Sequence, residues 1–269
     1  MAPTIRPASR ADLSTFVQLF PELGVDDPVP DEARWMRDFV PHSVFAEEAG
    51  VPLGVLFGHA LGDMGYVRVI IVSPEARGRG VGRSLMQHAR EDFRARGCTR
   101  WCLNVKEENA AARALYEKCG MSTRYVSTKM RLAWSALARL PASPPAITVR
   151  EVDPSEDAMV ERAIDMPTGW FAQARGQNLH VFLRVIDPTR PEDAHVGFAR
   201  FTPSFSGSFP FGVEEPVLAR VFLEAMKARA LPGQEAVNLI VENNAPLTRA
   251  LLAAGAAHGF DMLHLRGEI

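Results

Sequence analysis

The sequence has little net charge, few cysteines and no long apolar run, and each of these shortages narrows what the protein can do. Its 30 Lys and Arg residues are balanced by 32 Asp and Glu residues, which leaves a formal net charge of −2. We therefore expect no nucleic-acid partner and no attraction to an anionic membrane. No run approaches the roughly 18 apolar residues of a membrane-spanning helix, and the first residues lack the apolar core of a signal peptide. These shortages predict a soluble, cytoplasmic protein.

The cysteines argue against both a disulfide framework and a metal centre. There are three, Cys98, Cys102 and Cys119, an odd number without the histidine pairing of a zinc site. Reduced thiols in a cytosol explain them better than disulfides do. We expect no bound metal.

The length of the chain predicts two domains. A chain of 269 residues is long for one small domain and sufficient for two, each with its own core. The segment LPASPPA, at 140–146, contains three prolines and is typical of a stiffened linker. We therefore expect a first domain at 1–138, a proline-rich linker at 139–146 and a second domain at 147–269.

The first domain is organised around residues 67–93. The β-branched run at 67–72 predicts a buried strand. Gly78, Gly80 and Gly82 follow at alternate positions, and apolar residues then recur every four positions, as on one face of a helix. The predicted order is strand, glycine loop, helix.

This order suits a phosphate-bearing ligand. The first turn of a helix presents unpaired N–H groups, and glycines let an anion approach the backbone. Arg77, Arg79 and Arg83 add guanidinium groups, which match phosphate oxygens. The spacing fits poorly to a Walker loop or to a Rossmann fingerprint. A di- or triphosphate-like group is the expected ligand, and a merely flexible basic turn is the structural alternative.

Two motifs resemble those of a known superfamily. The first, RGRGVG at 77–82, resembles the Arg/Gln-x-x-Gly-x-Gly/Ala signature of the GNAT superfamily of acyl-CoA-dependent N-acyltransferases. The second, NAAARALYEKCGM from Asn109, resembles the family's Asn-x-x-Ala-x-x-Leu-Tyr-x-x-x-Gly-Phe signature, with Met121 in place of the aromatic residue. Asn109 lies 27 positions after Gly82, in the family's order. The resemblance implies an α/β fold with a mixed central sheet flanked by helices.

The resemblance also implies roles for individual residues, with acetyl-CoA as co-substrate. Contacts to its pantetheine arm are expected from Ile70, Ile71, Val72 and Asn109, and contacts to its phosphates from Arg77, Gly78, Arg79, Gly80, Val81, Gly82 and Arg83. A backbone N–H near Ile71 or Val72 is the expected oxyanion donor. Tyr116 matches the residue that protonates the leaving thiolate. The structural alternatives are a helix cap for Asn109 and a packed aromatic side chain for Tyr116.

The acceptor side is less well defined by the resemblance. Many family members carry a glutamate base where this chain has Tyr66. The base therefore stays open between Asp63, Glu47, Glu48, His59 and a water chain. The family places a helical region over the acceptor, so pocket candidates, or simply core residues, are Trp35, Met36, Phe39 and His42. A loop is expected from Gly24 to Pro30.

The second half repeats the first with altered chemistry. Residues 239–256 mirror 103–121, and Asn244 precedes Gly255 by the same 11 positions that separate Asn109 from Gly120. This predicts two tandem copies of one fold. The arginine–glycine loop has no counterpart, because Glu214 and Glu215 stand there and would repel pyrophosphate, and the tyrosine is replaced by Leu251 or Leu252. We expect a degenerate, catalytically silent second copy.

These observations predict an N-acetyltransferase. It would transfer the acetyl group of acetyl-CoA to a primary amine of a small molecule or peptide, by direct attack through a tetrahedral intermediate. One alternative is a non-catalytic acyl-CoA-binding sensor or interaction module. Another is a tandem acetyltransferase similar to mycothiol synthase, in which the later domain carries the activity. A monomer or homodimer is expected.

Overall fold

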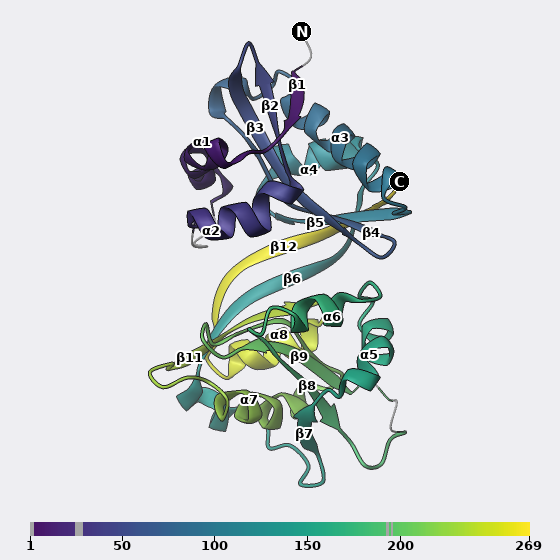
Figure 1. Cartoon of the computed structure of the whole chain (residues 1–269). Helices are drawn as coiled ribbons and strands as arrows, with labels where there is room; N and C mark the ends of the chain where they lie inside the picture. The colour runs from purple at the N-terminus through teal and green to yellow at the C-terminus, as the bar shows by residue number, and fades with distance from the viewer. Residues whose placement is uncertain (1–2, 25–28, 192–193, 195) are drawn as a thin grey trace. The chain divides into compact units, whose positions relative to one another are not determined.

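The computed structural model describes residues 3–24, 29–191, 194 and 196–269 (Figure 1). Most of the loop predicted between Gly24 and Pro30 lies outside these residues. The chain forms two compact units, the first made of Met1–Arg124 with His264–Ile269 and the second of Tyr125–Leu263.

The first unit contains a mixed sheet. Its strands are β1 (Thr4–Pro7), β2 (Ser43–Glu48), β3 (Val51–Leu61), β4 (Met64–Val72) and β5 (Arg100–Lys106), in that spatial order. The pairs from β1 to β4 are antiparallel, whereas β4 and β5 are parallel. A parallel pair needs a long crossover. Here the crossover contains α3 (Val81–Ala95).

Helices cover both faces of this sheet (Figure 1). On one face lie α1 (Leu13–Leu19) and α2 (Glu32–Arg34), which continues as a π-helical turn to Phe39. Trp35 and Phe39 pack in this face's core, so they are core residues, and Met36 is exposed. On the other face Phe93 of α3 packs so closely that a Cβ on Gly65 would lie 2.2 Å from its ring. Glycine is therefore required there.

The second unit repeats this order of elements. Its sheet runs β6–β11–β10–β9–β8–β7, with β10 and β11 parallel and the other four neighbouring pairs antiparallel. The strands are β6 (Ser122–Ala133), β7 (Thr148–Glu151), β8 (Val181–Ile186), β9 (Gly197–Thr202), β10 (Gly207–Val213) and β11 (Ala236–Glu242). The helices are α5 (Asp157–Ala163), α6 (Trp170–Arg175), α7 (Ala219–Lys227) and α8 (Ala245–Ala253).

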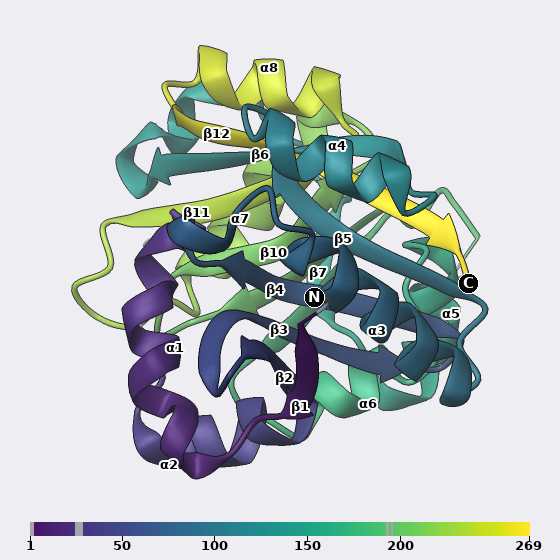
Figure 2. The same ribbon diagram turned by 90° about the horizontal axis from the view of Figure 1, so that it is seen from above.

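The two units exchange their closing strands. The last strand, β12 (Ala257–Glu268), ends in the first unit, where the Ile269 N–H donates to the Thr99 carbonyl at 2.9 Å (Figure 2). Conversely, β6 follows α4 (Ala110–Lys118) of the first unit but pairs with β11 in the second. The compact units therefore divide between residues 124 and 125, ahead of the proline-rich segment at 140–146. Because the end of the last strand belongs to the first unit, no single cut in the sequence separates the two units.

Candidate functional site

Strands β4 and β5 separate before either of them ends. Their pairing runs from Met64 with Arg100 to Val67 with Leu103, whereas β4 continues to Val72 and β5 to Lys106. A bulge lies at the point of separation, because Phe57 pairs with Val69 and Gly58 with Val67, which leaves Arg68 as the extra residue. The β5-facing backbone of Ile70–Val72 is thus left for an extended ligand. We call this opening the fork.

A glycine turn lies at the open end of the fork. Gly78 and Gly80 adopt φ of +75° and +85°, where L side chains are strained, although a Cβ at either position would meet nothing within 4 Å. The first intrahelical bond of α3 is from the Ser84 N–H to the Gly80 carbonyl. In the described part of the chain, the N–H groups of 81–83 have no protein acceptor, so they are available to an anion.

Two of the three loop arginines are already paired. Arg77 donates to the Val72 carbonyl at 3.3 Å and binds Glu22 at 2.5 Å, while Arg79 binds Glu48. These pairs are exposed, and such pairs contribute about 0–1 kcal/mol, so a phosphate can replace the carboxylates. Arg83 is exposed and has no ion pair to another described residue. The loop is therefore less positive than its sequence alone indicates.

Helix α4 packs against the glycine turn. A Cβ on Gly82 would lie 3.0 Å from Leu115 Cδ2 and 3.6 Å from Val72 Cγ2, so Gly82 brings α3, α4 and β4 together. The neighbouring Tyr116 is only 5% exposed. Burial, and to a smaller extent Cys119, raises the pKa of Tyr116 well above its usual value. The phenol therefore stays protonated at neutral pH, as a proton donor requires.

The predicted contact residues differ in exposure. Val81 and Ile71 are buried, Ile70, Val72 and Gly82 are half-buried, and the exposed members are Arg77, Gly78, Arg79, Gly80, Arg83 and Asn109. The structure brings the strand, the turn and α4 together around the fork. Among the described residues no group of acidic, histidine or cysteine side chains could hold a metal ion, and the three cysteines form no disulfide.

The described residues of the second unit form no comparable fork. There the parallel pairing reaches Phe211 with Val241, one residue before β11 ends. Asn244 caps α8 through the Leu247 N–H, and its side-chain amide donates to the Val213 carbonyl at 2.8 Å. Asn109 likewise caps α4, through the Ala112 N–H at 3.1 Å, but its amide NH₂ has no partner among the described residues.

Polar rings gather next to the fork, on the sheet face that α1 and α2 cover. The His59 ring lies 6.4 Å from that of His42 and 5.6 Å from that of Tyr66, centroid to centroid. Burial, with smaller effects of Arg68 and His42, lowers the pKa of His59 to about 4. The His42 Nδ1 is buried without a hydrogen-bond partner among the described residues. His59 is thus a neutral hydrogen-bond acceptor at neutral pH.

The carboxylates considered as bases are all ion-paired. Glu47 binds Arg6 at 2.7 Å, and Glu48 binds Arg79. Asp63 binds Arg100 at 2.9 Å. Of the side chains predicted as possible bases, only His59 lacks an opposite charge in the described structure.

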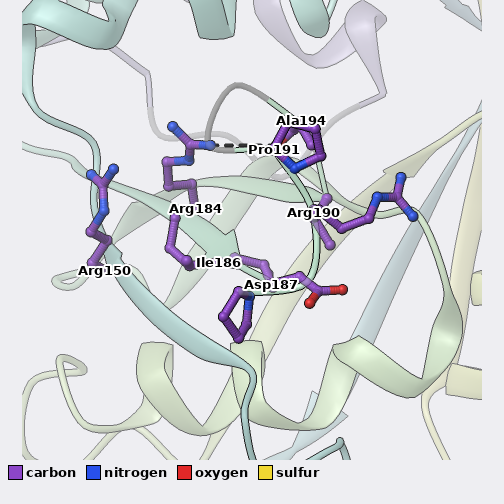
Figure 3. A pocket seen from close by; sticks show the side chains of 10 residues that line it. Arg150, Arg184, Ile186, Asp187, Arg190, Pro191 and Ala194 are labelled. Atoms are coloured by element: carbon purple, nitrogen blue, oxygen red, sulfur yellow. Dashed lines mark hydrogen bonds between the residues drawn. The ribbon is translucent and has the colours of Figure 1, made fainter.

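A hollow of about 260 Å³ in the second unit is lined by none of the predicted site residues (Figure 3). Its arginines are ion-paired, because Arg150 and Arg184 both bind Glu156 at 2.6 Å and Arg190 binds Glu214 at 2.9 Å. Arg184 also donates to the Ala194 carbonyl at 3.3 Å. We assign no ligand to this hollow.

Sequence reasoning missed three residues near the fork, namely Asn104, His264 and Arg266. The His264 Nδ1 lies 2.9 Å from Asn104 Oδ1, a contact between residues 160 positions apart. A contact between residues so far apart leaves no motif in the local sequence, so these residues could not be found from the sequence.

Comparison with known proteins agrees with this geometry. The model of the acetyltransferase (GNAT) family matches residues 11–121. That part of the chain is similar to the GNAT family. Mycothiol acetyltransferase from Beutenbergia cavernae is 50% identical over 58 residues, which are 22% of this chain and 20% of that protein. The chain therefore matches only a fifth of that relative's length.

Solved structures share the fold of the whole chain. A putative acetyltransferase from Pyrococcus horikoshii has a TM-score of 0.71 at 15% identity, over 100% of this chain and 90% of that one. A GCN5-related N-acetyltransferase from Sphaerobacter thermophilus has a TM-score of 0.68 at 17% identity, over 98% and 95%. A tandem GNAT protein from the clavulanic acid biosynthesis pathway has a TM-score of 0.61 at 16% identity, over 98% of both chains. The predicted mixed α/β fold with tandem GNAT-like parts is confirmed.

None of the described helices combines the length and apolar character needed to cross a membrane.

Proposed function

We propose that the first unit transfers the acetyl group of acetyl-CoA to a primary amine. The observation that carries this proposal is the fork between β4 and β5, which opens towards the arginine–glycine turn in the first unit and is closed in the second. An extended arm with a pyrophosphate at one end matches this shape, since strand backbone pairs with amides and a helix N-terminus binds phosphate.

Each predicted residue then has a role. The backbone of Ile70–Val72 pairs with the pantetheine arm, and one N–H near Ile71 or Val72 donates to the developing oxyanion. The phosphates lie against Arg77–Arg83, and the unpartnered amide of Asn109 adds a contact to the arm. Tyr116, kept protonated by burial, supplies the proton that the departing thiolate takes up.

The acceptor is the amine of a small molecule or peptide, bound on the face that carries His59. A neutral imidazole accepts a hydrogen bond from an attacking amine, whereas the nearby carboxylates are engaged by arginines. A mycothiol-synthase-like protein would place activity in the later unit, where the fork is closed. We also infer a cytoplasmic protein, supported by cysteines that form no disulfide, and a monomer or homodimer.

Two measurements test this proposal. Calorimetry should find one acetyl-CoA site per chain, and the release of free thiol from acetyl-CoA should depend on an added amine. Arg79→Ala should weaken binding about tenfold, because it removes a cation from the turn. Arg190→Ala is the matched control, since it also removes an arginine paired to a glutamate but in the second unit. Two equal sites, or binding without amine-dependent thiol release, would favour the sensor alternative.

A further inference from the structure

The C-terminal segment His264–Ile269 lies in the first unit, although the first part of its strand, Ala257–Leu263, belongs to the second. In the sheet, β12 is the neighbour of β5. The Ile269 N–H donates to the Thr99 carbonyl at 2.9 Å, and Leu265 is only 1% exposed. Residues that come after the second unit in the sequence are therefore part of the packed sheet of the first unit.

Gly267 lies at a point of very close packing in this segment. A Cβ on Gly267 would lie 2.7 Å from Trp101 Nε1 and 2.9 Å from the Gly120 carbonyl oxygen, and Met121 Cγ would follow at 3.3 Å. The first two atoms cannot move away easily, because Trp101 is fully buried and the Gly120 oxygen belongs to the backbone. Packing therefore requires glycine at position 267, and any side chain there displaces a neighbour.

The Gly120 carbonyl belongs to the peptide group that closes α4. The N–H of this Gly120–Met121 peptide donates to the Tyr116 carbonyl at 3.1 Å, and the Cys119 N–H donates to the same oxygen at 3.0 Å. Gly120 adopts φ of +85°, the left-handed conformation in which helices commonly end. One planar peptide thus faces Gly267 with its oxygen and holds Tyr116 with its N–H.

Tyr116 is the residue of α4 whose position matters most for the proposed chemistry. Its side chain is enclosed, at 5% exposure, so it follows the backbone of the helix. A proton donor loses efficiency when it moves by about 1 Å from the atom that it protonates. The three atoms nearest to a Cβ on Gly267 belong to β5 and to the turn after α4, not to α3, where the phosphates bind. A displacement at Gly267 therefore acts on the proton donor and spares the phosphate turn.

We propose that Gly267 is a positioning residue for Tyr116, so that the C-terminal segment sets the proton donor of the acetyl transfer. It acts through the Gly120–Met121 peptide. The degenerate second unit, which carries the first part of β12, thus holds the strand on which turnover in the first unit depends. This inference rests on the proposed function, because it concerns the group that protonates the departing thiolate.

Gly267→Ala in the full chain tests this proposal. The added methyl group pushes on the Gly120 oxygen, so kcat for amine-dependent thiol release, expressed per acetyl-CoA site, should fall about 10–100-fold. Acetyl-CoA affinity in calorimetry should change by less than about threefold, because the phosphate turn is not displaced. Hydrogen exchange at the Met121 N–H should become faster. Glu268→Ala changes an exposed side chain on the same strand and should leave all three measurements unchanged.

A second background separates positioning from general packing. In Tyr116→Phe, the further change Gly267→Ala should cost no additional kcat, because the group through which Gly267 acts is gone. If circular dichroism shows that Gly267→Ala is unfolded, the same change is made in Trp101→Phe. That background removes the nearest indole atom, keeps the push on the Gly120 oxygen, and is compared with Trp101→Phe alone.

The outcomes distinguish this inference from the proposed function. An unchanged kcat in folded Gly267→Ala, or the same loss of kcat with and without the Tyr116 hydroxyl, overturns the positioning role while acetyl transfer stands. A wild type that binds acetyl-CoA but releases no thiol with any amine overturns the proposed function and the positioning role with it.

Discussion

Asn244 donates its side-chain amide to the carbonyl of Val213 at 2.8 Å and so ties the start of α8 to the end of β10. Asn109 stands at the equivalent position in the first unit and caps α4 without such a bond among the described residues. The asparagine therefore ties a helix to a strand in the second unit, whereas in the first unit its amide NH₂ is left for a ligand. Within the described residues, this difference accompanies the open fork of the first unit and the closed strand pair of the second.

The Gly82 position should control acetyl-CoA binding through packing. Gly82→Val places side-chain atoms where a Cβ alone would already lie 3.0 Å from Leu115. Overpacking of this kind costs about 1–3 kcal/mol, so we expect acetyl-CoA affinity measured by calorimetry to fall about tenfold. Gly212→Ala, where a Cβ meets nothing within 4 Å, is the control in the second unit. Wild-type affinity in Gly82→Val would show that α4 does not shape the turn.

Replacement of Tyr116 should affect turnover and not binding. Tyr116→Phe removes the proton donor but keeps the ring that fills the buried position, so kcat should fall by about 10²–10⁴-fold with an unchanged acetyl-CoA affinity. Because burial raises the pKa of Tyr116 above its ordinary value of about 10, the wild type should show no loss of kcat from this group below about pH 10. An unchanged kcat in Tyr116→Phe would leave the tyrosine as a packing residue.

The strand, turn and helix around Gly80 could be predicted from sequence because their signals are local. The predicted strand at 67–72 lies within β4 (Met64–Val72), and the helix starts at Val81 as the glycine spacing indicates. The assignment of contact residues to acetyl-CoA stays a prediction.

Other features of the site depend on residues that are distant in the chain. Arg77 and its partner Glu22 are 55 positions apart, so the sequence does not show that the loop charge is partly neutralised. The exchange of β6 and β12 is equally hidden, because the apolar pattern of a strand does not identify its neighbour. His59 and Tyr66 meet only through the register of β3 and β4.

His59 should titrate far below an ordinary histidine. Burial first, then Arg68 and His42, lowers its pKa from 6.5 to about 4, so its NMR titration should have a midpoint near 4. Arg68→Gln should raise that midpoint, because it removes a neighbouring positive charge. His42→Gln offers a parallel variant on the other side of the ring. A wild-type midpoint near 6.5 would contradict the burial of His59.

The same shift has a consequence for stability. Between pH 6.5 and 4 the unfolded imidazole binds a proton that the folded one does not, so the stability from neutral His59 is full above pH 6.5 and is lost as pH falls towards 4. The loss is at most about 3 kcal/mol. Urea unfolding at pH 7 and 4.5 should show a smaller decrease for His59→Asn than for the wild type. Equal decreases would mean that His59 is not responsible.

The two asparagines should separate stability from binding. Asn109→Ala and Asn244→Ala each remove a helix cap, which costs about 1 kcal/mol of unfolding free energy. Asn244→Ala should cost about 1 kcal/mol more, because it also removes the bond to the Val213 carbonyl. Only Asn109→Ala should weaken acetyl-CoA binding in calorimetry, since its amide lies at the open fork. If Asn244→Ala weakened binding as much as Asn109→Ala, the ligand site could not be confined to the first unit.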